Sequence, residues 1–242
     1  MSDKPVIVLI HGHGVNASIW DAVYDNLSAD FSIIKSNFSE HTKHESIDAY
    51  AEEVFSQLQT SQIQSCVLVG HSMGGYIALA FAEQHPELVQ GLVLINSTAF
   101  ADDEAKKQSR QKAVETMEAS GSGAFIEQTV PKMFGESYSR NQPEVVKKQV
   151  EQFSALPAEA LIAGVKAMAS RPDRTHVLKE ASFPVLLIAG REDQIIPFAK
   201  SQELFEAAPQ AKTVVLEKAG HLGMIESPDE VIRAIREFVG PL

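Results

Sequence analysis

In this 242-residue chain, the residue whose sequence surroundings most directly suggest catalytic chemistry is Ser72. It lies in Gly70-His71-Ser72-Met73-Gly74, between a short apolar run at 67–69 and an apolar helical pattern at 77–81. A tight strand-to-helix turn would hold its Oγ out from the backbone beside a helix N-terminus, with the glycines leaving room for crossing backbones. The glycines could also simply punctuate a strand-helix junction, with the serine as the N-cap of the helix. The spacing alone leaves both interpretations open.

Three other polar segments follow apolar, strand-like runs. They are His11-Gly12-His13-Gly14, Asp193 in the loop after 183–190, and His221 after the run at 212–217. In a parallel sheet, ligands and catalytic groups collect at the carboxyl ends of the strands. His221 alone would more often be a loop histidine, and Asp193 alone a turn residue. Together with Ser72 they supply a nucleophile, a base and an orienting carboxylate, the set that activates a hydroxyl near neutral pH.

The elements that must position these residues alternate between strands and helices. Helical patterns follow Ser18 and Ser46, which are good N-caps, and recur at 199–207 and 228–239. Because every strand is followed by a crossover, we expect a mainly parallel six-stranded sheet flanked by helices, an α/β fold. The predicted strands are 5–10, 31–35, 67–70, 91–95, 183–190 and 212–217.

The alternation stops in the middle of the chain. Residues 97–182 contain no strand-like run, and helical patterns cover 103–119, 124–134, 143–155 and 158–169. We therefore expect an α/β core from residues 1–96 and 183–242, interrupted by a helical insertion at 97–182. Some of the larger apolar residues of this insertion should face a cleft: Phe100, Met117, Phe125, Met133, Phe134 and Met168.

Taken together, these motifs resemble the α/β-hydrolase fold family over essentially the whole chain. The resemblance implies that Ser72 is the nucleophile, His221 the general base and acid, and Asp193 the carboxylate that orients it. It also implies an oxyanion hole from the backbone N–H groups of Met73 and His13, a helical cap over the pocket, and no cofactor. The chain departs from the family at 37–46, which replaces a glycine-containing loop, and it begins at the strand that usually comes third.

Composition excludes several other classes of protein. The formal net charge of −11 argues against nucleic acid or an anionic membrane as a partner. No apolar run reaches membrane-spanning length, and residues 1–4 lead into a strand without a signal peptide, so we expect a cytoplasmic protein. The single cysteine, Cys66, excludes an internal disulfide. His41 and His44 form an H-x-x-H pair without a third ligand, so we expect no metal site.

The resemblance predicts a serine hydrolase that cleaves a carboxylic ester, thioester or lactone of a small, mostly apolar molecule, its expected partner. A carboxylesterase is the first choice, and an enol-lactonase, a C–C bond hydrolase and a perhydrolase remain open on the same residues. Serine at position 72 disfavours the family's dehalogenases and epoxide hydrolases, which use aspartate there. A catalytically silent ligand receptor of the same fold is the alternative from another class. The sequence gives no signal for the oligomeric state.

Overall fold

A six-stranded, fully parallel sheet forms the centre of the protein, which is known from a computed structural model describing residues 4–242. The strands lie in the order β2-β1-β3-β4-β5-β6, which confirms the predicted parallel sheet and its strand number. The strand bounds are β1 (Val6–Ile10), β2 (Ser32–Ser36), β3 (Cys66–His71), β4 (Val89–Ile95), β5 (Val185–Gly190) and β6 (Lys212–Leu216).

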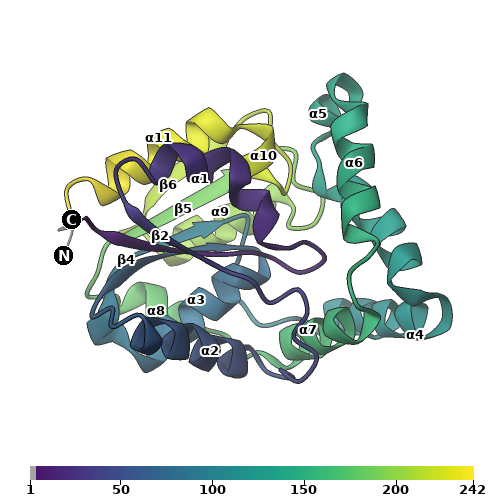
Figure 1. Cartoon of the computed structure of the whole chain (residues 1–242), viewed down its shortest axis with the longest axis horizontal. Helices are drawn as coiled ribbons and strands as arrows, with labels where there is room; N and C mark the ends of the chain where they lie inside the picture. The colour runs from purple at the N-terminus through teal and green to yellow at the C-terminus, as the bar shows by residue number, and fades with distance from the viewer. Residues whose placement is uncertain (1–3) are drawn as a thin grey trace.

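Helices cover both faces of this sheet (Figure 1). α1 (Asp21–Leu27) and α11 (Pro228–Val239) lie along one face, and α2 (Ile47–Thr60) and α3 (Met73–Gln84) along the other. Every residue of β3 and β5 is buried, because a parallel sheet with helices on both sides has no solvent-facing surface. This is why the central strands appear in the sequence as continuous apolar runs.

The start of the first helix differs from the prediction. Ser46 accepts a hydrogen bond from Ala49 N and caps α2, as expected. Ser18 instead lies within a short 3₁₀ turn, η1 (Ala17–Trp20), and the N-cap is Asn16, whose Oδ1 accepts from Ser18 N at 3.0 Å. Asparagine and serine cap helices about equally well, so the apolar pattern could not decide between two candidates two residues apart.

Every regular element between β4 and β5 is a helix. α4 (Glu104–Met133), α5 (Glu136–Asn141) and α6 (Pro143–Phe153) form the right-hand part of Figure 1, away from both chain ends. α7 (Ala158–Ser170) and α8 (Thr175–Lys179) lead back to the sheet. α4 consists of two helical stretches that meet at Gly121, where φ 79° and ψ 175° are not helical and only glycine adopts them readily. This break agrees with the two helices predicted at 103–119 and 124–134. The short α5 and α8 were missed.

Three shorter elements complete the order: η2 (Pro86–Leu88), α9 (Phe198–Ala207) and α10 (Gly223–Glu226). Within residues 4–242, no helix is both long enough and apolar enough to cross a bilayer. The expectation about a missing signal peptide falls partly on residues 1–3, which lie outside the described residues.

Close backbone packing around α3 gives a stability prediction. A Cβ at Gly74 would lie 2.2 Å from Ile10 O, and a strand backbone cannot easily move away. We expect Gly74→Ala to lower the free energy of unfolding by about 1–3 kcal/mol or more in urea titrations. Gly123→Ala is the matched control, because a Cβ there meets nothing within 4 Å and the residue is helical. It should be neutral or stabilising by about 0.5–1 kcal/mol; equal losses in both variants would contradict the packing explanation.

Candidate active site

The turn from β3 into α3 presents Ser72 in a conformation that non-glycine residues rarely adopt. Its φ and ψ are 52° and −117°. The turn is possible because the neighbouring glycines allow backbones to touch: a Cβ at Gly70 would lie 2.4 Å from Gly74 O. At Gly75 a Cβ would lie 2.2 Å from Ser97 Oγ. The glycines therefore do more than punctuate a junction, since the turn would not close with larger residues.

The end of β4 fixes the main chain of Ser72. Ser72 N donates to Ile95 O at 3.0 Å, and Ser97 Oγ donates to Ser72 O at 2.8 Å. The side chain makes no hydrogen bond that would hold it as the N-cap of α3. It lines a cavity of about 230 Å³ together with His221. The alternative interpretation of Ser72 as a helix cap is therefore not supported by the geometry.

Asp193 and His221 meet at the same edge of the sheet, as their positions after β5 and β6 indicate. His221 Nδ1 lies 2.8 Å from Asp193 Oδ2, and both side chains are 1 % exposed. The other oxygen, Oδ1, accepts from Ile195 N at 2.8 Å and Ile196 N at 2.9 Å. A carboxylate only accepts, so the proton in the 2.8 Å contact is on Nδ1 and the second ring nitrogen is left to accept one.

Asn96 is a site residue that sequence reasoning missed. It follows β4 with a φ of 48°, and its Nδ2 donates to Asp193 Oδ2 at 2.9 Å and to Gly220 O at 3.0 Å. One amide group thus holds the carboxylate and the loop that carries His221. The available signal was its position at the carboxyl end of a central strand, where short polar side chains tolerate left-handed backbone.

Two further side chains hold the His221 loop. His71 Nε2 lies 2.9 Å from His221 O; a carbonyl only accepts, so this ring nitrogen carries a proton. Glu226 accepts from Gly220 N at 2.9 Å, Leu222 N at 3.0 Å and Gly135 N at 2.8 Å. The same carboxylate therefore bonds both sides of His221 and the chain just after α4. Nothing in the sequence around Glu226 pointed to this contact.

The first loop of the core contacts the helical segment through His13. Its Nε2 donates to Leu161 O in α7 at 2.8 Å, and its ring packs against Gly164, where a Cβ would lie 2.8 Å from Cδ2. Burial lowers the pKa of His13 to about 4, more than the hydrogen bond to Leu161 raises it. The neighbouring His11 donates from Nδ1 to Gly12 O at 2.7 Å and accepts from Phe38 N at 2.8 Å.

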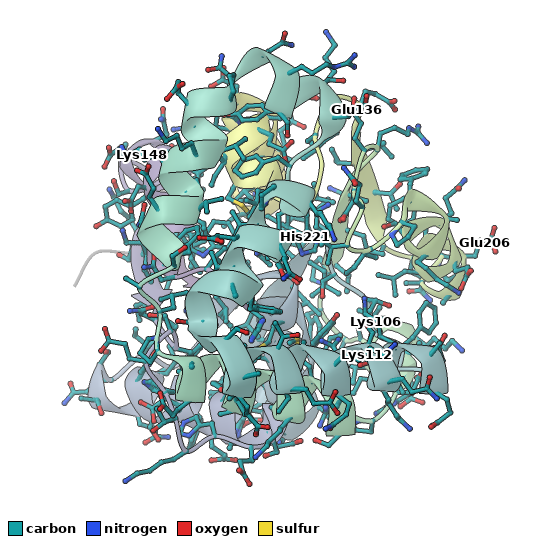
Figure 2. All side chains as sticks on the ribbon, turned by 90° about the vertical axis from the view of Figure 1, so that its right-hand side faces the viewer. Lys106, Lys112, Glu136, Lys148, Glu206 and His221 are labelled. Atoms are coloured by element: carbon teal, nitrogen blue, oxygen red, sulfur yellow. The ribbon has the colours of Figure 1, made fainter. Side chains whose placement is uncertain are left out.

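The cavity beside Ser72 is mostly apolar and draws on both the core and the helical segment. Figure 2 views the molecule from this side, with His221 near the centre of the face. Of the six apolar residues considered from the sequence, Phe125, Met133 and Met168 line the cavity, while Phe100 lines an adjoining cavity of about 560 Å³. Met117 and Phe134 are buried in helix packing instead.

The structure brings Ser72, His221 and His13 to one cavity, with Asp193 behind His221. Met73 is the first residue of α3, so its N–H has no partner within the helix. His41 and His44 lie apart from this cavity, with their rings 5.0 Å apart and packed around Tyr50 and Phe38. Across the described part of the chain, no group of three or more His, Cys, Asp or Glu side chains could hold a metal ion.

Comparison with known proteins agrees with this architecture. The sequence model of a family described as "alpha/beta hydrolase fold" matches residues 5–228. A pimeloyl-[acyl-carrier protein] methyl ester esterase from Aeromonas salmonicida is 27 % identical over 98 % of this chain and 96 % of its own. A thermophilic esterase from Thermogutta terrifontis is 29 % identical, with a TM-score of 0.89 over 98 % of this chain and 90 % of its own. The enol-lactonase from Burkholderia xenovorans LB400 shares the fold, at 22 % identity and a TM-score of 0.90 over 99 % of this chain and 92 % of its own.

Glu226 gives a pH prediction for the loop that holds His221. Burial raises the pKa of its carboxyl above the usual 4.5, more than the three N–H donors lower it, and the nearby charge of Asp193 raises it further. A raised pKa in the folded state means that stability is full below the unfolded-state pKa and is lost as the pH rises through the folded-state pKa. The excess stability of wild type over Glu226→Gln should therefore fall as the pH rises above about 4.5. Urea titrations at several pH values measure it; an excess that grows with pH would contradict the raised pKa.

Proposed function

The chain belongs to the α/β-hydrolase fold family, and from this premise we propose that it is a serine hydrolase that cleaves a carboxylic ester. The substrate is a small, mostly apolar molecule, and the acyl group is carried by Ser72 during the reaction. Ser72 is the nucleophile, His221 the general base and acid, and Asp193 the residue that orients His221. A lactone or thioester offers the same carbonyl chemistry.

The observation that carries this proposal is the hydrogen bond between His221 Nδ1 and Asp193 Oδ2 beside a serine in a strained turn. This bond turns the other ring nitrogen of His221 into a proton acceptor, on a histidine that lines the same cavity as Ser72. A serine hydroxyl is a weak nucleophile unless a base takes its proton as it attacks. The pair of residues supplies that base and fixes its tautomer.

In the first step, Ser72 Oγ attacks the ester carbonyl while its proton passes to Nε2 of His221. The carbonyl C=O becomes a tetrahedral oxyanion, for which the N–H groups of Met73 and His13 are the proposed donors. His221 then gives the proton to the ester oxygen, the C–O bond breaks, and the alcohol leaves. Asp193 stabilises the imidazolium that exists between these two transfers.

In the second step, water replaces the alcohol. His221 takes a proton from the water as it attacks the acyl-Ser72 carbonyl, and returns it to Ser72 Oγ when the acid leaves. Residues 97–182 act as a cap in this proposal: Phe125, Met133 and Met168 of the helical segment cover the cavity that contains Ser72. An apolar cover excludes bulk water and strengthens the electrostatic interactions of the reacting groups.

The preference for an ester over other carbonyl substrates is supported by the relatives above whose names include an esterase activity. The likeness to an enol-lactonase, at 22 % identity, supports the fold only.

The assignment of the nucleophile can be tested directly. A fluorophosphonate should label one residue, Ser72, and Ser72→Ala should abolish the labelling. Turnover of a soluble chromogenic ester should fall on the order of 10⁴-fold or more, because the three residues act as a unit. Peptide mass spectrometry identifies the labelled residue. Labelling of another serine, or near-normal turnover by the alanine variant, would refute the proposal.

The role of Asp193 gives a second test. Asp193→Asn should reduce kcat near pH 7 by on the order of 10⁴-fold, because the amide favours the wrong His221 tautomer and leaves its imidazolium without a counter-charge. Asp173→Asn is the matched control: this exposed carboxylate accepts from Thr175 N at 2.9 Å before α8, away from His221. The kcat of Asp173→Asn should stay within a few-fold of the wild-type value. Retained activity in Asp193→Asn together with a large loss in the control would exclude the proposed orienting residue.

A further inference from the structure

The charged residues that line the cavity of Ser72 are cationic, in contrast to the negative net charge of the protein as a whole. The chain has a formal net charge of −11, with 32 acidic and 21 basic residues. The cavity that contains Ser72 and His221, however, is lined by two cationic residues, Lys106 and Arg110, and by no carboxylate of the described residues. A pocket for an entirely apolar substrate has no need of these charges.

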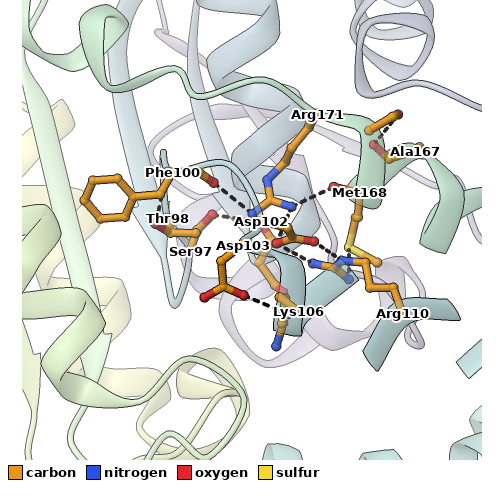
Figure 3. A network of polar contacts seen from close by, with 12 residues as sticks. Ser97, Thr98, Phe100, Asp102, Asp103, Lys106, Arg110, Ala167, Met168 and Arg171 are labelled. Atoms are coloured by element: carbon orange, nitrogen blue, oxygen red, sulfur yellow. Dashed lines mark hydrogen bonds and ion pairs between the residues drawn. The ribbon is translucent and has the colours of Figure 1, made fainter. Parts of the chain in front are cut away.

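Most charged groups around this pocket are already neutralised by neighbours. Arg110 and Arg171 both contact the buried carboxylate of Asp102, Arg171 Nη1 at 2.8 Å from Asp102 Oδ1 (Figure 3). Arg171 also donates to Met168 O at 2.7 Å. In the lining of the adjoining cavity, Lys200 pairs with Glu203 at 2.7 Å.

Lys106 is different, because its Nζ has neither an ion pair nor a hydrogen bond within residues 4–242. Of the two acidic residues closest before it in the sequence, Glu104 pairs with Lys107 at 2.8 Å, and Asp103 caps α4 by accepting from Lys106 N at 2.7 Å. Lys106 is an exposed residue; loss of hydration around its stem and the nearby charge of Arg110 lower the pKa of its ammonium, more than the charges of Asp102 and Asp193 raise it. An anion beside Lys106 would offset both effects.

Lys106 also stands where two cavities meet. Together with Tyr76, Ser109, Ile195 and Ile196, it lines both the cavity of Ser72 and the adjoining one of about 560 Å³. A molecule with its carbonyl at Ser72 can therefore extend past Lys106 into the larger cavity. The lining of the larger cavity includes the apolar Phe100 and Pro197 beside the carboxylates of Asp102, Asp103 and Glu203. Its apolar part suits a short hydrocarbon chain between two polar ends.

We propose that Lys106 forms a subsite for a carboxylate carried by the substrate, so that the enzyme acts on esters bearing a free acid group. One unpaired ammonium matches one singly charged anion, and Arg110, held by Asp102, adds to the positive field without moving. The inference rests on the proposed esterase function and specifies its substrate class. The carboxylate can lie on the acyl side or on the alcohol side of the ester.

The test compares each acid with its neutral amide analogue. Monomethyl glutarate places the carboxylate on the acyl side, and 3-acetoxypropanoate places it on the alcohol side. Wild-type enzyme should prefer the acid over its amide in kcat/KM in at least one of these pairs. Lys106→Gln should reduce this preference by about ten- to a hundredfold, mainly through KM, as expected for a lost charge-assisted hydrogen bond. Lys106→Arg should restore most of it.

Lys112→Gln is the matched control. Lys112 lies on the same stretch of α4 (Figure 2), about 120° around the helix from Lys106, and does not line either cavity. The preference of the Lys112→Gln variant for the acid over its amide should equal that of wild type. No preference for the acid in either pair, or a preference that survives Lys106→Gln, would overturn the subsite while leaving the esterase function intact.

Glutarate binding by calorimetry reads the subsite without turnover. In a Ser72→Ala background, Lys106→Gln should weaken glutarate binding about tenfold or more relative to Lys112→Gln. This result would support the subsite even if no ester were cleaved, in which case the proposed function alone would fail. Equal glutarate affinity in the two variants, or no binding by either, would overturn the subsite.

Discussion

A serine at φ 52° and ψ −117° persists only where the surrounding chain permits no other conformation. Such a backbone costs on the order of 1–3 kcal/mol, which the packing around it must offset. Here β1 and the end of β4 supply that packing. Gly74 lies against Ile10 O, and Ile95 O and the Ser97 hydroxyl just after β4 hydrogen-bond the N–H and C=O of Ser72. Because these contacts need all three strands in register, the position of Ser72 depends on the whole centre of the sheet.

Histidines that are buried or partly buried connect the loops around that turn. His11, His13 and His71 each contact a backbone carbonyl, and burial lowers the pKa of all three below its usual value. They are therefore neutral near pH 7 and donate one proton each in a fixed direction. His221 differs because its partner is a carboxylate, and this contact is what makes it suitable for proton transfer. The four imidazole rings are chemically the same, so the difference between His221 and the other three comes from their hydrogen-bond partners.

The sequence was enough to predict six parallel strands and the polar residues that follow them, because long apolar runs and their crossovers are visible in the local sequence. Ser72, Asp193 and His221 could be placed together for the same reason. Asn96, Glu226 and Lys106 could not. Asn96 acts through an amide that also suits a plain turn, and Glu226 contacts segments on both sides of the helical insertion. Such contacts depend on how distant loops meet, which the pattern of apolar residues does not encode.

The buried charges of the helical segment explain how a lysine can be held at a defined place on a solvent-facing helix. The Asp102 side chain is 3 % exposed, and burial alone would raise its pKa, but Arg110 and Arg171 outweigh that effect and lower it. A carboxylate so enclosed is costly unless both arginines stay in contact with it. Asp102 therefore ties the loop after β4 to α4 through Arg110, and to the end of α7 through Arg171. Since Lys106 lies one helical turn before Arg110, the same contacts that neutralise the buried charges also fix the turn of α4 that presents the unpaired ammonium to the cleft.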